Sequence, residues 1–210
     1  MDYIIQKLFS IPVLIIAFTL HELAHGLAAY MMGDKTAKYS GRLSLNPLKH
    51  IDWFGFLMLM VAGIGWAKPV PVDMSRFRDP KKGMAITALA GPFMNVILCF
   101  VSLVMYALGW IYEWNEYVVL FFYLSAHYNA VLAMFNLLPI PPLDGSKILL
   151  AFLPDRYYFK FMQYEQYGML LIIILSFTNI SSRIISAGVD NLINKLWRIV
   201  VELLEILGVA

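Results

Sequence analysis

The stretch FTLHELAHGLAAY, residues 18–30, holds three ionisable side chains within five positions: His21, Glu22 and His25. On an α-helix, His21 and His25 lie about 40° apart and one turn from each other, so both imidazoles can reach one metal ion. Glu22 is offset by about 100°, which places it beside the metal, where it can act on a water molecule. The H-E-x-x-H pattern therefore predicts a zinc site that activates water.

These three side chains lie in an apolar segment that is long enough to cross a membrane. An ionisable side chain at the centre of a bilayer costs at least ~2.5–3.5 kcal/mol on insertion scales. Polar residues satisfied by neighbouring helices are the alternative interpretation, but three desolvated ionisable groups would then bring no gain. A zinc site accounts for the cost.

A catalytic zinc ion usually has three protein ligands and one position open to water. The third ligand must come from elsewhere in the chain, and the candidates are His50, His127, Asp52, Asp73, Asp144 and Asp155. Asp144 stands out because three prolines interrupt the apolar segment just before it, in FNLLPIPPLDG. Unwound backbone there would let the carboxylate turn back toward the bundle. A simple Asp-Gly turn is the alternative interpretation of Asp144.

The composition indicates which elements position these residues. Of the 210 residues, 60% are hydrophobic and 14% are charged, whereas soluble domains average roughly 45–50% and about 25%. We expect long spans at about 4–32, 84–110, 117–138 and 167–188, since a crossing needs ~20 apolar residues. The first span lacks the basic n-region and cleavage site of a signal peptide, so we expect it to be retained. The small net charge of +2, spread over loops, argues against nucleic-acid binding.

Two segments follow other patterns. The apolar part of residues 51–73 is too short for a comfortable crossing, so a re-entrant or β-hairpin segment is expected there. Residues 189–208 place most of their polar side chains on one face, which predicts a C-terminal amphipathic helix at the interface or against the bundle. The whole chain is thus expected to be an all-α polytopic membrane protein.

The charges of the loops predict the orientation. Loops 33–50, 67–82 and 139–166 carry four, five and three Lys or Arg residues, whereas loop 111–116 carries two Glu residues and no base. Basic loops remain in the cytoplasm. We therefore expect an external N-terminus and an active site toward the cytoplasmic side of the cell membrane.

Three motifs in this order, HELAHG, GPFMN (residues 91–95) and NLLPIPPLDG (residues 136–145), resemble the site-2 protease family of intramembrane zinc metalloproteases. The loop stretches GRLSLNPLKHID and GWAKPVPVD are similar to those of its compact prokaryotic members, which lack PDZ and CBS domains. The resemblance implies a three-helix catalytic core and one Zn²⁺ per chain. It implies His21, His25 and Asp144 as zinc ligands and Glu22 as the catalytic acid and base.

Asn95 and Asn136 also match the family motifs. An Asn amide in a wet cavity could hold a substrate backbone or a developing oxyanion. The alternative is hydrogen bonding between helices, which is common for Asn in membrane bundles.

We therefore expect a single membrane-embedded domain over residues 1–210, with a catalytic core at about 4–150 and a C-terminal span and amphipathic helix at about 166–210. Its function is predicted to be hydrolysis of peptide bonds within or near transmembrane segments of substrate proteins in the lipid bilayer. A zinc or cation transporter and an inactive scaffold that binds membrane proteins are the alternatives. The sequence does not indicate an oligomeric state.

Overall fold

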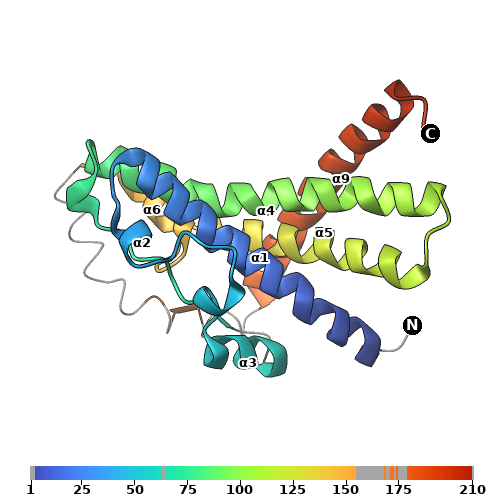
Figure 1. Cartoon of the computed structure of the whole chain (residues 1–210), viewed down its shortest axis with the longest axis horizontal. Coiled ribbons are helices and arrows are strands. Elements are labelled where there is room, and N and C mark those ends of the chain that lie inside the picture. The colour runs from blue at the N-terminus through green and yellow to red at the C-terminus, as the bar shows by residue number, and fades with distance from the viewer. Residues whose placement is uncertain are drawn as a thin grey trace.

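The computed structural model describes residues 3–62, 65–154 and 179–209, together with residues 168, 171, 172 and 174. Three long helices, α1 (Tyr3–Met32), α4 (Pro80–Ile111) and α5 (Glu116–Asn136), run along the long axis of the molecule (Figure 1). Each is long and apolar enough to cross a membrane. The predicted spans at 4–32, 84–110 and 117–138 are thereby confirmed.

Local sequence explains where two of these helices begin. Asp79 caps α4 by accepting a hydrogen bond from the Lys82 N–H, and Pro80 occupies the first helical position. Asn115 caps α5 by accepting from the Tyr117 N–H. Only a short turn, residues 112–115, joins the two helices, so they pack antiparallel. The C-terminal end of α1 therefore lies where α4 begins, and α5 runs back toward that end and stops part of the way along α4 (Figure 1).

The short apolar segment at 51–73 forms α3 (Trp53–Ala62), and its described remainder, residues 65–73, has no regular secondary structure. A helix of ten residues spans about 15 Å, which is half the ~30 Å hydrocarbon core. The segment is thus too short to cross as a helix. The described residues contain no β-strand, so the β-hairpin alternative is not confirmed.

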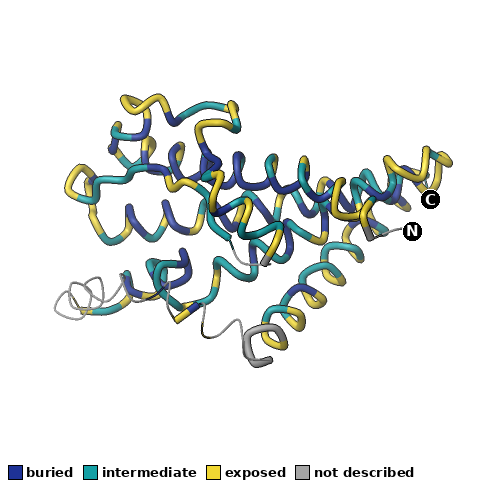
Figure 2. The backbone as a smooth tube through the Cα atoms, turned by 90° about the horizontal axis from the view of Figure 1, so that it is seen from below, coloured by how far each residue is buried: buried dark blue, intermediate teal, exposed yellow. Residues whose placement is uncertain are grey.

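The amphipathic C-terminal helix is confirmed as α9 (Asn179–Ile206), along which exposed positions alternate with intermediate ones and a few buried ones (Figure 2). Its apolar face packs against α4 and α5 in one cluster whose buried members are Cys99, Leu103, Ala107, Ala126, Ala130, Val189, Val200 and Leu204. The alanines allow close approach of the helices. The predicted span at 167–188 overlaps the first turns of α9, and most of its earlier residues lie outside the described part of the chain.

Candidate metal centre

Three side chains predicted as ligands converge at one point. His21 and His25 come from α1, and Asp144 is the first residue of α6 (Asp144–Ala151). The two Nε2 atoms lie 3.0 Å apart, and Asp144 Oδ2 lies 3.3 Å from His21 Nε2 and 3.1 Å from His25 Nε2. All three residues are buried. Within the described residues, they form a group that could hold a metal ion.

The geometry of these atoms fits a zinc ion. Tetrahedral zinc binds His nitrogens at ~2.0–2.1 Å, so its ligand atoms lie about 3.3 Å from one another, close to the spacing observed. The other ring nitrogen of each histidine is engaged elsewhere: His25 Nδ1 lies 2.6 Å from the Thr87 carbonyl oxygen, and His21 Nδ1 lies 2.5 Å from Asn95 Oδ1. A carbonyl oxygen only accepts, so His25 carries its proton on Nδ1 and directs the lone pair of Nε2 to the shared point.

The proline-rich loop carries Asp144 back to α1. Helix α5 ends at Asn136, and the chain turns before α6 begins at Asp144. Gly145 allows this tight return, because a Cβ atom there would overlap the backbone of Leu137 and Leu138. Burial opposes ionisation of Asp144, but the adjacent His25 and His21 lower the pKa of its carboxyl below the ordinary value. Asp144 is therefore held as a carboxylate, the form that binds metals.

Glu22 is buried next to this cluster but is not one of its three members. Its Oε2 atom accepts a hydrogen bond of 2.8 Å from the Val70 N–H. The segment 65–73 that contains Val70 is held in place by loop 40–50, since Arg42 Nη2 donates to the Lys68 carbonyl at 2.7 Å and the Lys68 N–H donates to the His50 carbonyl at 2.9 Å. Burial lowers the pKa of the Arg42 guanidinium, and the charge of Glu22 opposes that shift.

The two asparagines suggested by the family motifs lie in different surroundings. Asn95 is fully buried, and its side chain contacts His21 through Oδ1 and donates from Nδ2 to Asn129 Oδ1 at 2.8 Å. Asn136 is half-buried at the end of α5, where its Nδ2 donates to the Leu132 carbonyl at 3.0 Å. The structure thus brings Asn95, but not Asn136, into contact with a metal-binding side chain.

The remaining candidate ligands serve local structure. His50 Nε2 bonds the Ser44 carbonyl, Asp52 accepts from the Gly55 N–H, and Asp73 accepts from Ser75 and Arg76. His127 is exposed on α5. Asp155 lies outside the described residues.

Sequence reasoning did not single out Thr87, Val70, Arg42 or Asn129 as parts of the site. Thr87 and Val70 act through backbone atoms, so their side chains give no signal. Asn129 is a polar residue inside an apolar span, and that alone could have marked it as a partner of another polar group.

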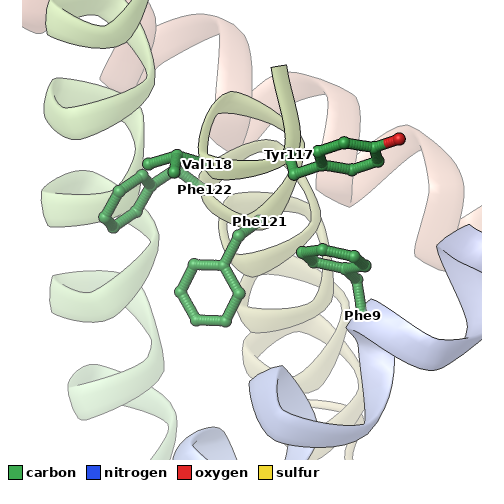
Figure 3. A pocket seen from close by; sticks show the side chains of 5 residues that line it. All are labelled: Phe9, Tyr117, Val118, Phe121 and Phe122. Atoms are coloured by element: carbon green, nitrogen blue, oxygen red, sulfur yellow. The ribbon is translucent and has the colours of Figure 1, made fainter. Parts of the chain in front are cut away.

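A hollow in the bundle lies apart from the metal centre. It is lined by Phe9 of α1 and by Tyr117, Val118, Phe121 and Phe122 of α5 (Figure 3). Its lining contains no histidine, carboxylate or cysteine, so it offers no group for hydrolytic chemistry.

A His-His-Asp cluster that could hold a metal ion, with an adjacent glutamate, in a bundle of three helices long and apolar enough to cross a membrane, is typical of a membrane-embedded metal-dependent hydrolase. The chain matches the model of peptidase family M50 over residues 9–116 and 111–178, and it belongs to this family. The resemblance to the site-2 proteases is thereby confirmed, and the protein is a multi-pass membrane zinc metalloprotease. Family membership favours this activity over the transporter and scaffold alternatives.

Individual relatives agree with this assignment. The chain is 38% identical to "Putative zinc metalloprotease YwhC" of Bacillus subtilis, over 88% of this chain and 89% of the relative. It is 26% identical to "Putative zinc metalloprotease Rip2" of Mycolicibacterium smegmatis, over 83% and 75% of the two chains. It is 34% identical to "Putative zinc metalloprotease MJ0611" of Methanocaldococcus jannaschii, over 67% and 72%. No solved structure matches the chain.

Proposed function

We propose that this zinc metalloprotease cleaves peptide bonds within or near transmembrane segments of other membrane proteins. The observation that carries the proposal is the position of His21, His25 and Glu22 on α1, a helix that is apolar and long enough to span the bilayer, with Asp144 of α6 beside the two histidines. A site on a membrane-spanning helix is suited to a substrate that also lies in the membrane.

Each residue has a distinct proposed role. His21, His25 and Asp144 would hold one Zn²⁺, which would act as a Lewis acid that polarises a carbonyl and lowers the pKa of water to about 7. Glu22 accepts a proton from the attacking water and then donates it to the nitrogen of the leaving amine. Its hydrogen bond from the Val70 N–H fixes the carboxylate beside the ligands without using it as a ligand.

The two asparagines are proposed to differ in role. Asn136 lies next to the loop that carries Asp144, and we retain for it a role in holding the substrate backbone or the oxyanion. Asn95 contacts His21 and Asn129 with both ends of its amide. We therefore propose that Asn95 orients the ligand His21 and does not bind the substrate.

The substrate must unwind before cleavage, because the peptide bonds of an intact helix are shielded by their neighbours. Gly, Pro or Asn residues near the cut lower helix propensity and should promote cleavage. By the positive-inside rule, the N-terminus lies outside the cell and the metal centre lies toward the cytoplasm.

Replacing Glu22 by Gln tests the proposed mechanism. The variant should lose cleavage of a membrane-tethered reporter yet keep zinc, because the amide cannot accept a proton and the ligands are unchanged. Comparing membrane fractions of cells that express wild type or E22Q by quantitative proteomics should reveal truncated single-span proteins only with the wild type. Cleavage at the wild-type rate by E22Q would refute the role of Glu22.

Elemental analysis of the purified protein tests the ligand set. We expect about one zinc per chain in the wild type, loss of zinc in His21→Ala and His25→Ala, and a strong reduction in Asp144→Ala. His127→Ala is the matched control, since this histidine is exposed on α5 and is not a member of the cluster, and it should keep its zinc. Full occupancy in Asp144→Ala would remove Asp144 from the ligand set.

A further inference from the structure

A chain of buried hydrogen bonds leads from His21 into the α4–α5 interface. His21 Nδ1 lies 2.5 Å from Asn95 Oδ1, and Asn95 Nδ2 donates to Asn129 Oδ1 at 2.8 Å. Asn129 Nδ2 in turn donates to the Ser125 backbone carbonyl at 2.8 Å. Asn95 is fully buried and Asn129 is 2% exposed, so neither amide has water as an alternative partner.

The direction of every bond in this chain follows from its last member. A backbone carbonyl can only accept, so the NH₂ group of Asn129 must face Ser125 and its oxygen must face Asn95. The NH₂ group of Asn95 must then face Asn129, which turns the Asn95 oxygen toward His21. An amide oxygen also only accepts, so the proton of the neutral His21 ring lies on Nδ1 and the lone pair lies on Nε2.

That placement of the proton is what metal binding requires, because Nε2 is the atom that faces His25 and Asp144. The other ligand histidine obtains the same result directly, since His25 Nδ1 bonds the Thr87 carbonyl. An Asn95 amide turned by 180° would instead present NH₂ to His21 Nδ1. The His21 proton would then move to Nε2 and block the metal.

We propose that Asn129 is a positioning residue of the metal centre, which fixes the orientation of the Asn95 amide and, through it, the tautomer of His21. Asn129 does not touch the ligand atoms. It acts by relaying the polarity of the Ser125 carbonyl over two side chains. The proposal rests on the proposed function only in taking His21 as a zinc ligand.

Zinc affinity, measured by competition with a chelator on the purified protein in detergent, tests this role without any protease assay. Asn129→Leu keeps the size of the side chain but removes its polarity. We expect it to weaken zinc binding about 10–100-fold, the usual effect of losing a partner that orients a ligand. Ser10→Ala is the control: it removes a different buried polar group, a hydroxyl that donates to the Lys7 carbonyl on α1 and takes no part in this series of hydrogen bonds, and it should leave the affinity unchanged.

A second background separates positioning from packing. Asn95→Asp places a carboxylate, which only accepts, against His21 Nδ1, so the histidine no longer depends on Asn129 for its tautomer. In this background Asn129→Leu should change zinc affinity less than about threefold (compared with the 10–100-fold expected above). An equal loss of affinity in both backgrounds would show that Asn129 acts through packing alone and would overturn the proposal. An unchanged zinc affinity in the single variant Asn129→Leu would also overturn the proposal.

The protonation of His21 can also be read in the wild type, which removes any dependence on folding of the variants. In the metal-free chain labelled with ¹⁵N-histidine, NMR should show a proton on His21 Nδ1. An unprotonated Nδ1 would overturn the proposal. Failure of the wild type to bind zinc would refute the proposed metal centre, whereas normal zinc binding that ignores Asn129 would refute only the present inference.

Discussion

At the residue scale, Gly91 leaves room for the two histidines that are the proposed zinc ligands of α1. A Cβ atom at this position of α4 would overlap the imidazole rings of both His21 and His25. Both rings therefore lie directly against the backbone of α4, where the Thr87 carbonyl and the Asn95 side chain can orient them. Only glycine allows α1 and α4 to approach this closely.

Gly91→Ala should accordingly impair zinc binding. Overpacking of a tight contact costs typically ~1–3 kcal/mol, which corresponds to about a 5- to 150-fold loss of affinity if the rings must move away from the shared point. Chelator competition measures the effect. Gly109→Ala in the same helix is the control, because its nearest neighbour is a Val119 methyl group that can shift slightly; equal losses in the two variants would contradict the specific role of Gly91.

At the scale of elements, the site joins parts that are far apart in the sequence. Helix α1 supplies two ligands and Glu22, α6 supplies Asp144, and the segment 65–73 supplies the N–H group that Glu22 accepts. Arg42 connects this segment to loop 40–50 through the Lys68 carbonyl. Because Arg42 is buried beside the charge of Glu22, it links the position of the segment to the carboxylate that we propose as the acid and base.

Arg42→Met should therefore lower cleavage much more than zinc binding. The substitution keeps an apolar stem but removes the donor to Lys68 and the positive charge near Glu22. Misplacement of a catalytic group by about 1 Å can cost ~10²-fold in rate, so we expect a loss of at least about tenfold in reporter cleavage with zinc near one per chain. Arg198→Met, at an exposed position of α9, is the control. Loss of zinc in Arg42→Met would instead assign Arg42 to the stability of the ligand cluster.

At the scale of the whole molecule, the basic loops 33–50 and 67–82 lie toward the end of the bundle where α1 ends and α4 begins. The acidic α4–α5 turn lies at the other end, and α5 runs from that turn back along α4 (Figure 1). His21 and His25 lie in the C-terminal half of α1 (Tyr3–Met32), and Asp144 follows the C-terminal end of α5. The metal centre is therefore nearer to the basic end of the bundle.

This asymmetry predicts where substrates are cut. If the basic end is cytoplasmic, cleavage should fall in the cytoplasmic half of a substrate span. A series of reporter spans with helix-weakening residues at successive depths, with products identified by mass spectrometry, measures the position. Cuts clustered in the external half would contradict the orientation. Soluble unstructured peptides that are cut faster than tethered reporters would show that the membrane location does not set specificity.

The sequence by itself determined the parts of this protein that depend on local patterns. The apolar length of the spans, the caps at Asp79 and Asn115, and the one-turn spacing of His21 and His25 are properties of neighbouring residues, so they could be predicted without tertiary structure. Asp144 could also be picked out from the sequence as a candidate ligand, because the prolines before it show that the helix must end. The ambiguity at 51–73 remained because a short apolar run suits a helix or a strand equally well.

Only the tertiary structure decided how those residues are held. The Val70 N–H that donates to Glu22 lies 48 residues from it in the sequence, and the Thr87 carbonyl that orients His25 lies 62 residues from that histidine. Backbone groups are the same for almost every residue type, so no sequence pattern marks which of them will meet a given side chain. The hydrogen bonds from His21 to Asn129 require α1, α4 and α5 to pack so that His21, Asn95 and Asn129 lie at the same level along the bundle. That alignment is set by contacts among all three helices.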